Sequence, residues 1–123
     1  MEARHLLLAE DDDMLAQLLH FKLAKEGFAV HHCSDGKQVK EQLAQQVPDI
    51  IVTDIMMPYF SGIELVDHVR NHMGLSLPII IISAAGNEVN VLNAFDLGAN
   101  DFVAKPFSPS ELLVRIAKEL KKV

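Results

Sequence analysis

Five residues with reactive side chains stand at or directly after the ends of short apolar runs: Glu10, Asp11, Asp54, Ser83 and Lys105. Such runs are typical of buried strands, and the ends of parallel strands can bring distant residues together. Two carboxylates about 4 Å apart repel by about 4 kcal/mol at an effective dielectric constant of roughly 20. A cluster of three must therefore take up protons, spread apart or bind a cation.

Oxygen ligands beside a lysine predict a Mg²⁺ site that suits phosphoryl transfer. All-oxygen ligands select a hard cation, and Mg²⁺ is the usual one when phosphate completes its shell. We expect Asp11 and Asp54 to bind the ion directly and Glu10 to act through water. Asp54 can be the nucleophile that forms an acyl phosphate. Lys105 and the ion would offset the charge of the transferred oxygens, and the Ser83 hydroxyl can donate to one of them.

Short apolar runs alternate with helical patterns along the chain, and this alternation predicts the strands and helices that hold these residues. The predicted strands are His5–Ala9, Phe28–Cys33, Ile50–Thr53, Ile79–Ser83 and Asp101–Ala104. Five βα units in succession predict an α/β fold, namely a (βα)5 flavodoxin-like, doubly wound parallel sheet with helices on both faces. Its strand order is 2-1-3-4-5, so strands one and three are neighbours at the switch point where ligands bind.

Local signals indicate where the helices begin. We expect Asp13 and Asn87 to cap the first and fourth helices. The second helix, which Asp35-Gly36 opens, is expected to bury Val39, Leu43 and Val47 on one face. Two further Ser-x-x-Glu patterns are typical of capping boxes: Ser61–Glu64 and Ser108–Glu111.

Length and composition limit the classes of protein that this chain can represent. Its 123 residues, half of them hydrophobic, suit one domain over residues 1–123. The net charge of −6 argues against direct binding of nucleic acid, which requires a basic surface. No apolar run approaches the roughly 20 residues of a membrane span, and the N-terminus lacks the layout of a secretory signal. We therefore expect a cytoplasmic location and no membrane partner.

The chain resembles the response-regulator receiver domains of two-component signal transduction (CheY-like) from about His5 to Leu120. The resemblance rests on the first strand with its acidic pair, on the phospho-acceptor segment, on a Ser/Thr segment and on the close of the fold. These motifs are Leu6–Asp12, Pro48–Pro58, Pro78–Ala84, Gly98–Phe102 and Lys105–Phe107.

The resemblance implies a phosphorylation switch. It implies that a sensor histidine kinase or a phosphotransfer protein donates the phosphoryl group to Asp54, and that the backbone carbonyl of Met56 joins the Mg²⁺ ligands. It implies that Ser83 swings toward the aspartyl phosphate while Phe102 follows inward. That movement changes the face formed by helix four, strand five and helix five, which controls an output domain or a partner protein. The domain then catalyses only its own phosphorylation and dephosphorylation, and is not otherwise an enzyme.

Whether the chain forms a phosphorylation-dependent homodimer is a question that the sequence leaves open. Asp101, Glu111 and Arg115 match charged positions of the dimer face in transcription-factor receivers. Val91, however, stands where that subfamily would place a basic residue.

Other classes of protein use similar residues. A haloacid-dehalogenase-like phosphatase also has an aspartate nucleophile, but it needs a second acid two residues later, where Met56 stands and cannot transfer a proton. A flavodoxin-like cofactor module needs a Ser/Thr/Gly-rich loop after strand one, and four acids stand there instead. The third alternative is a receiver-like interaction module that no longer depends on phosphorylation. The presence of all the acids, of Ser83 and of Lys105 argues against it.

Overall fold

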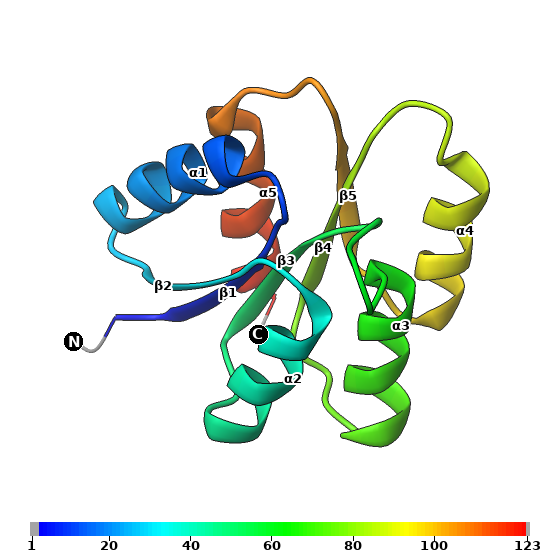
Figure 1. The fold of residues 1–123 in the computed structure, drawn as a ribbon. Helices are drawn as coiled ribbons and strands as arrows, with labels where there is room; N and C mark the ends of the chain where they lie inside the picture. The colour runs from blue at the N-terminus through cyan, green and yellow to red at the C-terminus, as the bar shows by residue number, and fades with distance from the viewer. Residues whose placement is uncertain (1–2, 123) are drawn as a thin grey trace.

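A five-stranded parallel sheet forms the centre of the molecule (Figure 1), of which the computed structural model describes residues 3–122. The strands lie in the order β2-β1-β3-β4-β5, as the sequence predicts. The β2 and β3 bounds differ by one residue from the expected ones, since Phe28 lies outside β2 and Asp54 closes β3. The strands are β1 His5–Ala9, β2 Ala29–Cys33, β3 Ile50–Asp54, β4 Ile79–Ser83 and β5 Asp101–Ala104.

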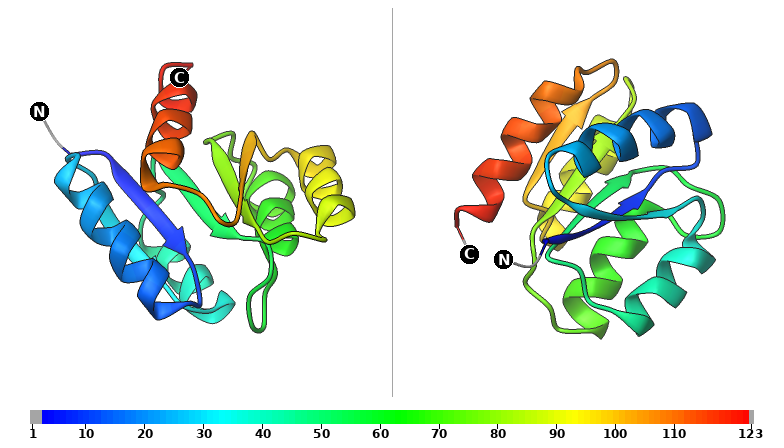
Figure 2. Two further views of the ribbon diagram at one scale, coloured as in Figure 1. Left: turned by 90° about the horizontal axis from the view of Figure 1, so that it is seen from above. Right: turned by 90° about the vertical axis from the view of Figure 1, so that its left-hand side faces the viewer.

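Helices cover both faces of the sheet. They are α1 Asp13–Lys25, α2 Gly36–Gln45, α3 Gly62–Asp67, α4 Glu88–Leu97 and α5 Pro109–Leu120, and α3 continues as a π-helical segment, η1 His68–His72. The right-hand view of Figure 2 shows α1 and α5 above the sheet and α2 and α3 below it. The polypeptide is thus doubly wound, which places every βα connection at the carboxyl edge of the sheet.

Alternate side chains of the strands divide the hydrophobic core into two clusters. Leu7, Ile51 and Ile81 face α2, α3 and α4, where Val39, Leu65 and Ala94 pack against the sheet. Leu6, Val52 and Ile80 face the other way, toward Leu19 and Leu23 of α1 and Leu112 and Ile116 of α5. Because β1, β3 and β4 are buried on both faces, their ends are held firmly enough to position side chains.

Two local predictions are wrong, and a third is confirmed only in position. Asp12, not Asp13, caps α1, because its Oδ1 accepts hydrogen bonds from Met14 N at 3.0 Å and Leu15 N at 3.2 Å. Asn87 occupies the N-cap position of α4, as predicted, but its side chain makes no capping hydrogen bond. Val47 is 49% exposed, because α2 ends at Gln45 and the chain is already extended at the next residue.

The remaining helix starts agree with the sequence. Ser61 and Glu64 form a reciprocal capping box at α3. Ser108 accepts a hydrogen bond from Glu111 N at α5, and Pro109 is the first helical residue. Within residues 3–122, no helix combines the length and the apolar character needed to cross a membrane.

Candidate functional site

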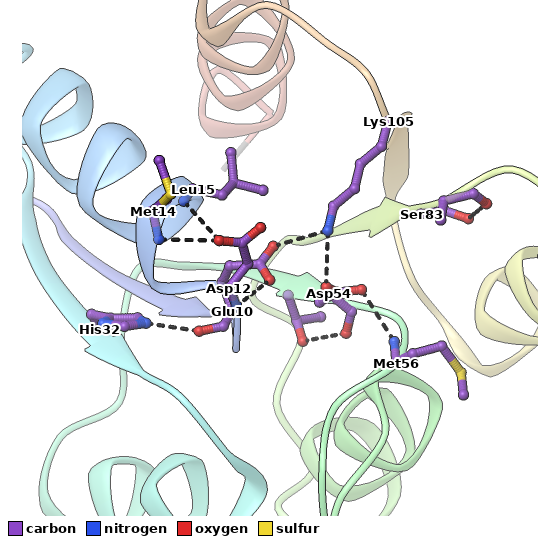
Figure 3. A network of polar contacts seen from close by, with 11 residues as sticks. Glu10, Asp12, Met14, Leu15, His32, Asp54, Met56, Ser83 and Lys105 are labelled. Carbon is purple, nitrogen blue, oxygen red and sulfur yellow. Dashed lines mark hydrogen bonds and ion pairs between the residues drawn. The ribbon is translucent and has the colours of Figure 1, made fainter.

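Side chains from three connections converge at the carboxyl edge of the sheet (Figure 3). Asp54 is the last residue of β3 and is 7% exposed, Glu10 follows β1 and is fully buried, and Lys105 follows β5. The Lys105 ammonium lies 3.2 Å from Asp54 Oδ2 and 3.5 Å from Glu10 Oε1. One cation therefore bridges two carboxylates that come from neighbouring strands.

Three carboxylates at this edge have the spacing of a cation site. Oxygens of Glu10, Asp11 and Asp54 lie within 4.8 Å of one another. Glu10 Oε1 is buried and, apart from the ion pair with Lys105 at 3.5 Å, makes no hydrogen bond, which is costly unless a ligand completes its contacts. An all-oxygen set with an unsatisfied buried acceptor fits Mg²⁺. Elsewhere in the described part of the chain, no group of three potential ligands comes together in this way.

Burial dominates the electrostatics of the site. Burial raises the pKa of Glu10 to about 7, and the nearby Asp54 charge adds to this, while a hydrogen bond from Asp12 N and the Lys105 charge act in the opposite direction. Burial also lowers the pKa of Lys105, but the Asp54 and Glu10 carboxylates outweigh that effect, so the pKa of Lys105 is raised. The metal-free site thus favours a proton on Glu10 and a firmly charged lysine.

The raised pKa of Glu10 predicts a pH-dependent stability of the metal-free protein. The folded state holds this proton up to about pH 7, whereas an unfolded glutamate loses it near 4.5. Stability should therefore fall as pH rises through that window, by on the order of 1–3 kcal/mol. Glu10→Gln removes the titration, so in EDTA at pH 8 this variant should be more stable than the wild type, with a smaller difference at pH 5. Urea unfolding followed by circular dichroism measures both values.

An exposed glutamate supplies the control for this experiment. Glu88→Gln, on the surface of α4, should leave the pH profile of the wild type unchanged. If Glu10→Gln were less stable than the wild type at pH 8, the unfavourable burial of the Glu10 charge would be contradicted.

The loop after β3 is folded tightly against the strand it leaves. Met56 N donates a hydrogen bond to Asp54 Oδ1 at 3.2 Å, and Gly62 N donates to Ile55 O at 2.9 Å. A Cβ atom at Gly62 would lie 2.5 Å from Asp54 O and 2.8 Å from Ile55 Cα, so any side chain there would displace the backbone of the site. This glycine, which the sequence shows only as part of a capping box, lets α3 start close to Asp54.

Two predicted residues lie apart from the cluster. Ser83 closes β4, but its hydroxyl donates to the carbonyl of Ala84 at 3.0 Å, and Figure 3 shows it to one side of Asp54 and Lys105. Phe102 is 37% exposed, and its ring meets Phe95 edge-to-face with centroids 6.0 Å apart. The structure therefore brings together Glu10, Asp11, Asp54 and Lys105, and leaves Ser83 and Phe102 turned away.

The charged residues of the expected dimer face pair within the chain. The Arg115 guanidinium lies 3.0 Å from Asp101 Oδ1 and 3.4 Å from Glu111 Oε2, and Lys118 lies 3.8 Å from Asp101 Oδ2. Val91, on α4, is 7% exposed and belongs to the core. Each of these charges therefore has a partner within the chain.

A histidine that the sequence did not indicate also reaches the site. His32 Nε2 lies 2.8 Å from Glu10 O, and Figure 3 shows the ring pointing from β2 toward the acidic turn. Its strand neighbour is Leu8, two residues before Glu10. The parallel pairing of the first two strands was the available signal, because the end of one such strand lies beside the end of the other.

Comparison with known proteins identifies the family of this fold. The family model of the response regulator receiver domain matches residues 6–117. A protein of Chloroflexus aurantiacus assigned as a response regulator is 33% identical over 98% of this chain and 99% of its own, with a TM-score of 0.90. The receiver domain of the Francisella response regulator 1452 is 32% identical over 97% of this chain and 98% of its own, with a TM-score of 0.87.

A longer regulator has the same fold in part of its chain. Full-length FixJ from B. japonicum is 28% identical over 99% of this chain and 60% of its own, with a TM-score of 0.90. The match to the family covers nearly the whole chain and includes the acidic turn, Asp54 and Lys105. The chain belongs to the response regulator receiver domain family.

Proposed function

We propose that residues 1–123 act as one receiver domain that accepts a phosphoryl group on Asp54 in a Mg²⁺-dependent reaction. The donor is a phosphohistidine of a sensor histidine kinase or of a phosphotransfer protein, and we place the exchange in the cytoplasm. The observation that carries the proposal is the position of Lys105, whose ammonium lies 3.2 Å from Asp54 and 3.5 Å from Glu10. A fixed cation beside a nucleophilic carboxylate is what the transfer of an anionic group requires.

The chain's own residues prepare Asp54 for the transfer. A carboxylate oxygen attacks phosphorus, the bond from phosphorus to the histidine nitrogen breaks, and that nitrogen keeps the electron pair. Met56 N and Lys105 hold the two Asp54 oxygens at 3.2 Å each, which orients the carboxylate. Glu10, Asp11, Asp54 and the Met56 carbonyl would hold Mg²⁺, which supplies charge neutralisation to the phosphoryl oxygens when it is bound.

Phosphorylation would change the face built from α4, β5 and α5. The Ser83 hydroxyl, now bonded to Ala84 O, would exchange that partner for an aspartyl-phosphate oxygen. Beside it lies a hollow of about 300 Å³ between α4 and β5, lined by Val91, Phe95 and Phe102 among others. That space would receive the Phe102 ring as it turns inward. The altered face would then control an output domain or a partner protein.

The phosphatase alternative lacks its general acid. Met56 occupies the position of the second acid, and its side chain cannot donate a proton to a leaving group. The chain would therefore retain the phosphoryl group on Asp54 instead of turning over many substrate molecules.

Incubation with acetyl phosphate tests the proposal. In the presence of Mg²⁺, we expect the intact protein to gain the mass of one phosphoryl group, and excess EDTA should abolish the gain because the clustered carboxylates would repel the anion. Assaying free phosphate in the same samples separates a receiver from a phosphatase. A protein that gains no mass at any Mg²⁺ concentration, or that gains it equally well in EDTA, would contradict the proposal.

A further inference from the structure

The three carboxylates of the proposed Mg²⁺ site are held in place in different ways. Glu10 Oε2 accepts a hydrogen bond from Asp12 N at 3.1 Å, and Glu10 Oε1 lies 3.5 Å from the Lys105 ammonium. Asp54 is held by Met56 N and Lys105. The Asp11 carboxylate is exposed and makes no hydrogen bond or ion pair within residues 3–122. The position of Asp11 therefore depends on its two flanking peptides, of which one is held through Asp12 N and the other joins Asp11 to Glu10.

The peptide between Glu10 and Asp11 lies just beyond the last hydrogen bond between β1 and β2, and a side chain bonds to its carbonyl oxygen. Glu10 N still donates to Cys33 O at 3.0 Å, which extends the pairing of β1 with β2 by one residue. Beyond Cys33 the chain turns into α2, where Ser34 N donates to Gln38 and Asp35 caps the helix. Among the described residues, the donor to Glu10 O is the His32 ring, at 2.8 Å. Because a carbonyl oxygen can only accept, the Nε2 atom of His32 carries the proton.

We infer that His32 is a positioning residue for the cation site. It holds the carbonyl of the Glu10–Asp11 peptide, and the orientation of that peptide sets the direction in which the otherwise unrestrained Asp11 carboxylate points. Groups that orient metal ligands without touching the metal commonly affect metal affinity. The inference rests on the proposed function, since it concerns the same Mg²⁺ site.

Substitutions at this position separate the hydrogen bond from the bulk of the ring. His32→Phe keeps a planar ring and removes the donor, whereas His32→Gln keeps an N–H donor at a similar reach. His31→Ala is the matched control, because His31 is the adjacent residue of β2 but contacts His5, with 3.0 Å between His31 Nε2 and His5 Nδ1. Neighbouring residues of a strand point to opposite faces, so this control loses a histidine contact away from Glu10.

Thermal unfolding at increasing MgCl₂ concentrations reports two quantities in one experiment. The midpoint without metal reports the stability of the fold, and its rise with MgCl₂ gives the dissociation constant of the ion. We expect His32→Phe to raise that constant about three- to tenfold. His32→Gln should restore most of the loss, and His31→Ala should leave the constant at the wild-type value even where it lowers the metal-free midpoint.

The outcomes distinguish this inference from the function on which it rests. A wild-type protein that is insensitive to MgCl₂ would overturn the proposed function and this inference together. If the wild type responds and His32→Phe responds equally, or if His31→Ala weakens binding as much as His32→Phe, only the positioning role of His32 would be overturned.

Discussion

Asp54→Asn is expected to lose nearly all uptake of a phosphoryl group from acetyl phosphate under conditions in which the wild type is labelled. An amide lacks the anionic oxygen that attacks phosphorus, so we expect labelling to fall by about 100-fold or more. The substitution is nearly isosteric and keeps an oxygen that can accept the hydrogen bond from Met56 N. Mass spectrometry of the intact protein measures the loss, and circular dichroism shows that the fold is retained.

A surface aspartate gives the matched control for this experiment. Asp96→Asn, on the exposed side of α4, should be labelled like the wild type. A phosphoryl group that persisted in Asp54→Asn would place the acceptor on another residue and contradict the role proposed for Asp54.

Most of the fold could be predicted because its signals are local and repeated. The run Ile79–Ile82 can be stable only where both faces are covered, and five short strand patterns separated by helical patterns leave few topologies. The strand order then places the residues after β1, β3 and β5 at one edge. The backbone thus brings Glu10, Asp54 and Lys105 to the same edge, and their side-chain conformations complete the contacts.

The features that could not be predicted depend on small differences between competing contacts. Asp12 and Asp13 are both good capping residues, and the helix starts one residue earlier than expected only because Asp12 reaches Met14 N and Leu15 N. The Ser83 hydroxyl can bond locally to Ala84 O, and no sequence pattern shows that this contact is preferred. The π-helical segment at His68–His72 departs from the regular 3.6-residue period on which helix prediction rests.

Lys105→Ala is expected to change metal binding and phosphorylation in opposite directions. Lys105 is the cation closest to the two buried acids, so its removal takes away repulsion toward a second cation. Because the Lys105 charge lowers the pKa of Glu10, its removal also raises that pKa, so Mg²⁺ binding is compared in alkaline buffer where the Glu10 carboxylate is ionised. There we expect Mg²⁺ to bind several-fold more tightly. The rate of labelling by acetyl phosphate should nevertheless fall on the order of 100-fold, because a fixed positive charge beside the transferred group is lost.

General damage to the site would not produce tighter Mg²⁺ binding together with slower labelling. A misfolded or loosened site would bind Mg²⁺ more weakly and be labelled more slowly, so both quantities would fall together. Lys105→Arg keeps the charge but spreads it over a planar group, and we expect intermediate labelling. Lys37→Ala, on the exposed face of α2, should behave like the wild type. If Lys105→Ala were labelled at the wild-type rate, the lysine would serve only to hold the metal-free acids together, and its proposed role in the transfer would be wrong.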